Sequence, residues 1–147
     1  MIKKLINRIF HDTKDEMSFR AAFDLTELPV ITLYQGDRKF NFLLDTGSNS
    51  SIIDSNVLDK IKYETNDVKS NLFGMEGKNR IVNMCTISLY FKDREYTYDY
   101  LINDMKDAFD GIKRETGVTI HGIIGSKFFN KFKYVLDFDK LIAYSKS

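Results

Sequence analysis

The residues best suited to chemistry stand together in the run Asp45-Thr46-Gly47-Ser48. Asp45 follows two leucines at the end of an apolar stretch, so its carboxylate is expected to be poorly solvated. Poor solvation disfavours the ionised form and prepares a carboxylic acid for proton transfer rather than for a salt bridge. The hydroxyls of Thr46 and Ser48 can orient the carboxylate, while Gly47 leaves the backbone open to a substrate or a second chain.

The same four residues are also ordinary loop formers. Asp45 could simply close a strand through a turn in which its side chain accepts a backbone N–H. A second motif favours a site: Gly122-Ile123-Ile124-Gly125 is followed by a short helical pattern over residues 126–132. A buried strand ending in Gly125 can pass close behind the Asp45 loop, because glycine permits tight backbone approach. The two segments are therefore expected to form one site.

The segments that must position these motifs have the texture of β structure. Runs rich in Val, Ile, Thr, Tyr and Phe predict three hairpins, over residues 28–45, 80–102 and 134–144, each with a short polar turn. Helical patterns are short and cover residues 55–61, 104–113 and 126–132. The predicted fold class is mostly β, a closed or sandwich-like domain with small helices at its corners.

Length, charge and cysteine content limit the class of protein. The chain has 147 residues, of which 43% are hydrophobic, which is enough for one ordered domain with its own core. Its 22 basic and 21 acidic residues give a net charge of +1, so no overall field attracts nucleic acid or an acidic membrane. No run approaches the ~20 apolar residues of a spanning helix. The lone Cys85 and the absence of a secretory signal pattern predict a soluble, cytoplasmic protein.

Other kinds of site find little support. His11 and His121 are far apart and have no paired Cys or carboxylate at ligand spacing, so neither a metal nor a cofactor is implied. Neither a phosphate-binding glycine loop nor a serine nucleophile elbow occurs. Cys85 lies in an alternating apolar run, which indicates a small buried side chain. Asp137, a rival carboxylate, lacks the Thr-Gly that follows Asp45 and is interpreted as a turn residue.

The order of these motifs resembles the retropepsin-type aspartic proteases over residues 26–144: apolar-apolar-Asp-Thr-Gly-Ser, a glycine-containing hairpin, then apolar-apolar-Gly before a short helix. The resemblance implies a closed β barrel with short helices that forms one lobe of a two-fold homodimer. It implies that Asp45 is the catalytic aspartate and that Thr46 locks the two active-site loops together. It also implies that residues 123–125, with Ile124 and Gly125, support the catalytic loop alongside Gly47 and Ser48.

The resemblance also implies which residues touch a substrate. Residues 71–78 stand where the family carries its flap, a mobile hairpin that closes over bound peptide. The implied contacts at its tip are Phe73, Gly74, Met75, Glu76 and Gly77. An ordinary loop with a bulge is the alternative, because two glycines in four residues suit either structure. Ile120 and His121 are implied to shape side-chain pockets of the groove.

Aspartic proteolysis makes a demand on assembly. Two carboxylates must share a proton, but the chain contains a single Asp-Thr-Gly and has room for one lobe. The second carboxylate must therefore come from another copy across a two-fold axis. The sequence predicts a homodimeric aspartic endopeptidase that acts on a peptide or protein substrate, with no nucleic-acid or membrane partner. The alternative is a non-catalytic dimerisation or peptide-binding domain of the same fold.

The domain organisation is predicted to be simple. Residues 26–147 form the protease-like domain, and residues 1–25 form an N-terminal extension. Apolar residues at helical spacing between Ile2 and Phe10 predict a short amphipathic helix in this extension. Its apolar stripe is expected to cover the main body or a partner subunit.

Overall fold

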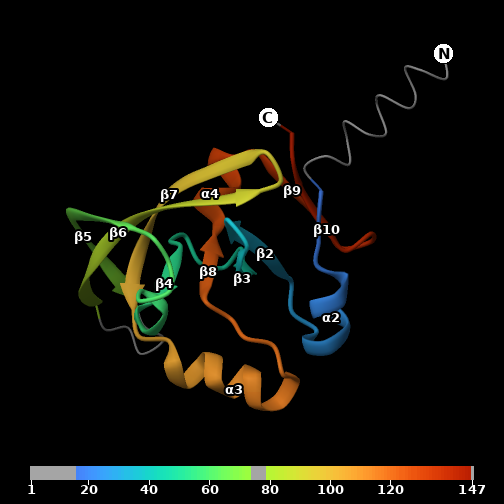
Figure 1. Ribbon diagram of the computed structural model, residues 1–147, viewed down its shortest axis with the longest axis horizontal. Coiled ribbons are helices and arrows are strands. Elements are labelled where there is room, and N and C mark those ends of the chain that lie inside the picture. Colours follow the sequence, from blue (N-terminus) through green and yellow to red (C-terminus); the bar gives the residue numbers. More distant parts are fainter. Residues whose placement is uncertain (1–15, 74–78, 147) are drawn as a thin grey trace.

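The computed structural model of the chain describes residues 16–73 and 79–146 (Figure 1). Within these residues the strands are β1 (Met17–Ser18), β2 (Val30–Gln35), β3 (Arg38–Asp45), β4 (Ile52–Asp54), β5 (Glu64–Phe73), β6 (Asn79–Phe91), β7 (Arg94–Asn103), β8 (Gly122–Gly125), β9 (Tyr134–Asp137) and β10 (Ile142–Ser145). The helices are α2 (Arg20–Thr26), α3 (Lys106–Thr116) and α4 (Ser126–Lys131), with a single 3₁₀ turn, η1, at Ser55–Val57. The predicted amphipathic helix near the N-terminus lies outside the described residues.

Six strands close into a barrel. Their order is β2-β3-β8-β4-β7-β6, and β6 pairs back onto β2. β5 extends the sheet beyond β6 as an edge strand. The pairs β3–β8 and β4–β7 are parallel, and the other pairs of the barrel are antiparallel. The predicted fold class, a mostly β closed barrel with short helices, is confirmed.

The barrel strands follow from alternating apolar residues in the sequence. In the hairpin β2–β3, Leu33, Phe40 and Phe42 are at most 2% exposed and point into the core. Gly36 takes a positive φ of 62° in the tight turn of this hairpin, a conformation that glycine adopts without strain. The strands β8 and β4 are buried along their whole length. The core therefore fixes the register of β3 and β8.

Aromatic side chains attach α4 to β7. Tyr96 and Tyr100 on β7 are fully buried, and Phe128 of α4 is 1% exposed. The Phe128 ring lies 5.3 Å from the Tyr98 ring and 5.8 Å from the Tyr96 ring, centroid to centroid. Such aromatic pairs add about 0.5–1.5 kcal/mol each beyond the area they bury. The three tyrosines Tyr96, Tyr98 and Tyr100 thus lie on the face of β7 that packs against the core and α4.

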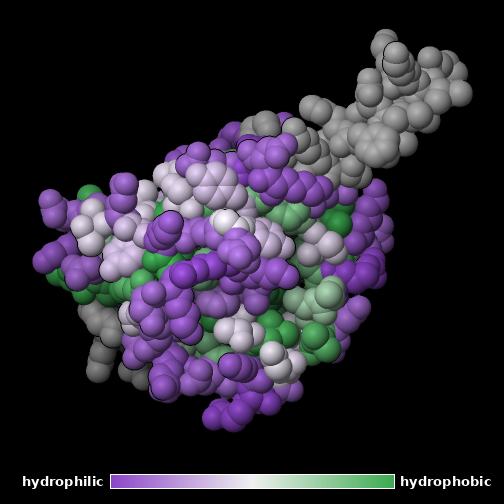
Figure 2. Space-filling model, viewed as in Figure 1, coloured by the Kyte–Doolittle hydropathy of each residue, from purple (hydrophilic) through white to green (hydrophobic). Residues whose placement is uncertain are grey.

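A second, three-stranded sheet covers the barrel beside α2. Its order is β1-β10-β9. Met17 and Phe19, which precede the predicted start of the domain at residue 26, are 2% and 1% exposed and belong to the core. The ring of Phe138, at the turn between β9 and β10, lies 5.3 Å from that of Phe19. Hydrophobic side chains remain on the surface beside α2 (Figure 2), where Leu25 is 64% exposed.

The helix predicted over residues 55–61 is absent, and this prediction was wrong. Only η1 forms, with the Asp54 carboxylate accepting the N–H of Asn56 at its start. Beyond η1, the Lys60 carbonyl accepts from the Arg38 guanidinium, and Lys62 bonds through its backbone to the Gln35 side chain. These long-range bonds hold the segment in an irregular path.

Among the described helices, none is long and apolar enough to cross a membrane.

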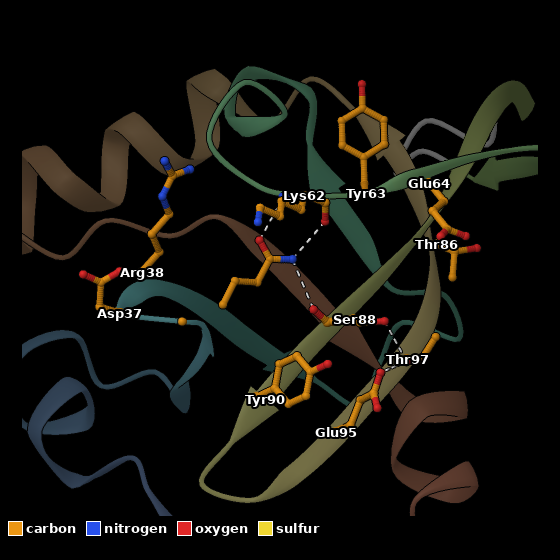
Figure 3. A pocket seen from close by; sticks show the side chains of 12 residues that line it. Asp37, Arg38, Lys62, Tyr63, Glu64, Thr86, Ser88, Tyr90, Glu95 and Thr97 are labelled. Atoms are coloured by element: carbon orange, nitrogen blue, oxygen red, sulfur yellow. Dashed lines mark hydrogen bonds between the residues drawn. The ribbon is translucent and has the colours of Figure 1, made fainter.

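The side chain of Gln35 completes the seam where the barrel closes. The strands β2 and β6 pair only at Tyr34 and Tyr90. Next to this bridge, Gln35 Nε2 donates to the carbonyls of Lys62 (2.9 Å) and Ser88 (3.1 Å), and Oε1 accepts the Lys62 N–H at 2.8 Å (Figure 3). The amide thus takes the place of a peptide group in the ladder.

Removal of this amide is expected to weaken the barrel. Gln35→Ala removes the partner of one N–H and two carbonyls, two of these bonds being exposed to water, so we expect a loss of about 0.5–1.5 kcal/mol in the free energy of unfolding. Asn130→Ala, which removes an exposed amide on α4, serves as the control and should change stability by less than about 0.5 kcal/mol. Urea titration of the two variants measures the difference. Equal midpoints for both would contradict this role of Gln35.

Candidate active site

Asp45 is the last residue of β3, where the chain leaves the barrel core. Leu44 before it is 5% exposed, Asp45 itself is half-buried, and Thr46 and Gly47 after it are exposed. The Gly47 N–H donates to Asp45 Oδ1 at 2.9 Å, and the Ser48 N–H donates to the Asp45 carbonyl at 3.2 Å. Asp45 therefore forms the turn that the sequence offered as the structural alternative, in which its side chain accepts a backbone N–H. Within residues 16–73 and 79–146, no hydrogen bond is made to Oδ2, so one oxygen is available for chemistry.

The hydroxyl of Ser48 does not orient the Asp45 carboxylate, and that prediction was wrong. Ser48 Oγ instead donates to the carbonyl of Ser50 at 2.7 Å and so ties the loop to itself. The loop carbonyls need such donors because they have left the strand ladder. The backbone N–H of Gly47 orients the carboxylate.

Gly125 lies directly against the Asp45 loop, as the sequence predicted. It is the register partner of Asp45 in the parallel pair β3–β8. A Cβ on Gly125 would lie 2.5 Å from the Ser50 carbonyl oxygen and 2.6 Å from that of Ser48, closer than any carbon–oxygen contact allows. The next residue, Ser126, donates its N–H to the Ser48 carbonyl at 2.7 Å. Only glycine permits this approach, and the two motifs form one structural unit.

Ser51 is a part of this unit that the sequence analysis missed. Its side chain is 3% exposed, and its Oγ accepts the N–H of Gly125 at 3.0 Å. Its carbonyl accepts the N–H of Leu101 on β7 at 2.9 Å. Ser51 therefore links the Asp45 loop to both neighbouring strands. A serine five or six residues after a turn carries no signal in the sequence that would single it out.

The predicted flap lies at the edge of what the structure describes. Phe73 ends β5, and its backbone pairs with Asn79 at the start of β6. The remaining implied contacts, Gly74, Met75, Glu76 and Gly77, lie outside the described residues. The strands that lead to this tip form an antiparallel hairpin, as the flap prediction requires.

Ile120 and His121 are not brought to Asp45. Ile120 is 2% exposed and packs in a core cluster with Val30 and Phe109. His121 bonds to Asn41 on β3: Nδ1 accepts the Asn41 N–H at 2.9 Å, and the His121 N–H donates to the Asn41 carbonyl at 2.8 Å. Asn41 precedes Asp45 by four residues, about 13 Å along the strand. Ile120 is too deeply buried to offer a surface to a substrate, whereas a groove role for His121 stays a prediction.

The environment of His121 favours its neutral form. Burial is the main cause that lowers the pKa of His121 below its usual value, and the positive charge of Lys60 adds to it. The imidazole lies against the Phe40 ring, 5.3 Å between centroids. A neutral ring can also accept the Asn41 N–H through Nδ1, whereas a protonated ring cannot.

The side chains of Cys85 and Asp137 have structural roles. Cys85 is fully buried, and burial, with a smaller effect of Asp99, raises the pKa of its thiol to about 11, so the thiolate is disfavoured at neutral pH. Asp137 Oδ1 accepts the N–H groups of Asp139 (2.9 Å) and Lys140 (3.0 Å), as a turn residue does. No group of three or more His, Cys, Asp or Glu side chains in the described residues could hold a metal ion.

A large cavity lies beside the turn of the β2–β3 hairpin. It has a volume of about 940 Å³ and is lined by residues that include Arg38, Lys62, Tyr63, Tyr90 and Glu95 (Figure 3). Arg38 begins β3, seven residues before Asp45, which corresponds to about 24 Å along the strand. The Arg38 side of this cavity therefore lies far from Asp45.

The comparisons with known proteins find similarity in structure and none in sequence. No protein-family model matches the chain, and no curated protein matches it in sequence. Among solved structures, the chain is similar to a retropepsin-like aspartic protease from Rickettsia conorii, with 15% sequence identity and a TM-score of 0.46. The match covers 88% of this chain and 91% of that chain.

A side chain at position 125 is expected to disrupt the unit. Gly125→Ala places a methyl group against two carbonyls that cannot move independently, and we expect a loss of about 2–3 kcal/mol in the free energy of unfolding. The control is Gly111→Ala in α3, where a Cβ meets only the end of the Arg114 side chain at 3.9 Å. That change should stabilise the protein by about 0.5–1 kcal/mol. Thermal unfolding distinguishes them, and a neutral Gly125→Ala would contradict the described contact.

The pH dependence of stability should reflect His121. Because its folded-state pKa is lowered, the unfolded chain binds the proton more readily, and stability present above pH ~6.5 is lost as the pH falls below it. His121→Asn keeps an acceptor for the Asn41 N–H but does not titrate. We expect the slope of unfolding free energy between pH 6.5 and 5 to be smaller in this variant, by at most about 1.4 kcal/mol per pH unit. Identical slopes in both proteins would contradict a buried neutral His121.

Proposed function

We propose that this chain is an aspartic endopeptidase that works as a homodimer, with one Asp45 carboxylate contributed by each copy. The observation that carries the proposal is the Asp45 loop itself. It is held from behind by Gly125 and Ser51, and it presents a half-buried carboxylate with an available Oδ2. A fixed carboxylate at the rim of a core is the arrangement that proton transfer requires.

The second copy is needed because one carboxylate cannot act as both acid and base. Two carboxylates at hydrogen-bond distance share one proton, since repulsion between like charges prevents both from ionising. Thr46 and Gly47 are exposed at the tip of the loop, which leaves the tip accessible to an identical loop across a two-fold axis. The apparent pKa values then belong to the pair and not to either residue.

The proposed reaction is the hydrolysis of a peptide bond by water. The ionised carboxylate accepts a proton from water as its oxygen bonds to the carbonyl carbon, and the protonated partner donates its proton to the carbonyl oxygen. As the tetrahedral diol collapses, one of its hydroxyls returns a proton to the ionised carboxylate, the C–N bond breaks, and the amine nitrogen receives a proton from the protonated carboxyl group. The products are a carboxylic acid and an amine, and the pair returns with one shared proton. The substrate is an extended peptide that pairs with protein strands.

Asp45→Asn is the direct test. We expect hydrolysis of an unstructured polypeptide between about pH 4 and 6 to fall by about 10³-fold or more, because an amide neither accepts nor donates the shared proton. The control is Asp137→Asn, which keeps an acceptor oxygen for the turn at Asp139 and should remain active. Sedimentation should show a folded dimer for both variants.

A mixing experiment tests whether the carboxylates come from different copies. Addition of excess Asp45→Asn protein to the wild type should lower the wild-type specific activity, because mixed dimers hold a single carboxyl group. Full activity of Asp45→Asn alone would contradict the mechanism. If the subunits have exchanged and excess variant still leaves the wild-type activity unchanged, the two carboxylates do not come from different copies. Peptide binding without any cleavage by the wild type would favour the non-catalytic peptide-binding domain.

A further inference from the structure

A second cavity lies directly beside the Asp45 loop and has no role in the proposed chemistry. Its volume is about 380 Å³. One wall is the continuation of the loop, Asn49, Ser50 and Ser51, and the other walls come from β5, β6, β7 and α4. A cavity that begins four residues after the candidate catalytic aspartate is within reach of the same ligand.

The lining of this cavity carries two lysines from one face of α4. Lys127 and Lys131 are four residues apart, the spacing that places two side chains on the same side of a helix. Within residues 16–73 and 79–146, neither ammonium forms an ion pair. The ammonium of Lys131 lies 5.3 Å from the ring centroid of Tyr98, which lines the cavity, and 5.3 Å from that of Phe132. Two cations that line one cavity repel each other, and a bound anion would relieve this repulsion.

The remaining polar lining does not neutralise the pair. Asp99 is the single carboxylate among the lining residues, and its Oδ1 accepts the hydroxyl of Thr86 at 2.6 Å. The ionisable side chains of the cavity are thus two cations and one anion. The other lining residues include serine, threonine and tyrosine, whose hydroxyls can donate to an oxygen ligand. The balance favours an anionic group over a cationic one.

The position of the two lysines determines the distance between a bound anionic group and the peptide bond that is cleaved. Gly125 pairs with Asp45 across ~4.8 Å, and Lys127 follows Gly125 by two residues. The α-carbon of Lys127 therefore lies within about 12 Å of the α-carbon of Asp45. Lys131 is about 6 Å farther along the helix. An extended peptide advances ~3.3 Å per residue. A side chain two to four residues from the scissile bond would therefore reach the cavity.

We infer that this cavity is a specificity pocket in which Lys127 and Lys131 bind the carboxylate of a Glu or Asp side chain of the peptide substrate, two to four residues from the cleaved bond. The inference rests on the proposed function, and it names the class of substrate: acidic peptide segments. Exposed ion pairs contribute ~0.2–1 kcal/mol each. Two such pairs correspond to a preference of about two- to thirtyfold for an acidic residue over its neutral isostere.

The test uses matched peptides and measures ratios within one protein. Peptides that differ only in Glu or Gln, at each position two to four residues from the scissile bond, are cleaved by the wild type and by the Lys127→Gln/Lys131→Gln variant. We expect the wild type to prefer Glu at one of these positions by a lower KM, and the variant to have a ratio of kcat/KM close to one. Lys113→Gln/Arg114→Gln, which removes two positive charges from α3, is the matched control and should keep the wild-type ratio.

Two further measurements separate failure of this inference from failure of the proposed function. Lys131→Glu should reverse the preference toward a Lys-containing peptide, and raised salt should weaken the wild-type preference. Binding of the same peptides, now labelled with a fluorophore, to the Asp45→Asn dimer should show the same Glu-over-Gln ratio without any cleavage. Cleavage or binding of Glu and Gln peptides with equal efficiency at every position would overturn the pocket. If no peptide is cleaved but the lysine-dependent Glu preference persists in binding, the pocket stands and the protease proposal fails.

Discussion

The backbone contact between Gly125 and the Asp45 loop is the constraint on which the site depends. Asp45 and Gly125 are eighty positions apart in the chain, yet they are neighbours in the parallel pair β3–β8. The contact is closer than any side chain would allow, and the hydroxyl of Ser51 and the N–H of Ser126 fix it from both sides. A carboxylate held this way keeps one orientation without a side-chain partner of its own, which leaves it available to a second molecule.

The two ends of the barrel differ in how the chain is held there and in the side chains that they present. At one end the Asp45 loop is braced by backbone contacts and lies next to a cavity with two cations. At the other end Gln35 closes the seam, and a larger cavity lies at the hairpin turn. Between them the interior is filled with apolar and aromatic side chains from every strand of the barrel. Pre-organised groups at the rim of a packed core can be positioned more precisely than groups on a free loop.

The elements that were predictable from the sequence are those with strong periodic signals. The hairpins β2–β3, β6–β7 and β9–β10 alternate between apolar and polar residues, and α3 and α4 have apolar residues at helical spacing. The strand β5 was not predicted, because an edge strand with exposed faces accepts a polar sequence such as Glu64-Thr65-Asn66-Asp67. The 55–61 segment has helical spacing, but contacts from Arg38 and Gln35 override it.

The site was predictable only in part. Asp45 and Gly125 could be paired in advance, because an aspartate before glycine and a strand that ends in glycine both signal close approach. The roles of Ser51 and Gln35 could not be predicted, because they depend on which distant backbone groups lack a partner in the folded chain. Lys127 and Lys131 looked like ordinary surface lysines of a short helix. Their common cavity arises only when α4 packs beside the Asp45 loop.

The central claim is that each chain holds half of a site. A crystal structure of the protein grown near pH 5 tests it most directly. The claim predicts a two-fold dimer in which the two Asp45 carboxylates face each other with oxygens about 3 Å apart, close enough to share one proton. A dimer with these carboxylates on separate surfaces, or a protein that is monomeric in solution at the concentrations where it cleaves peptides, would contradict it.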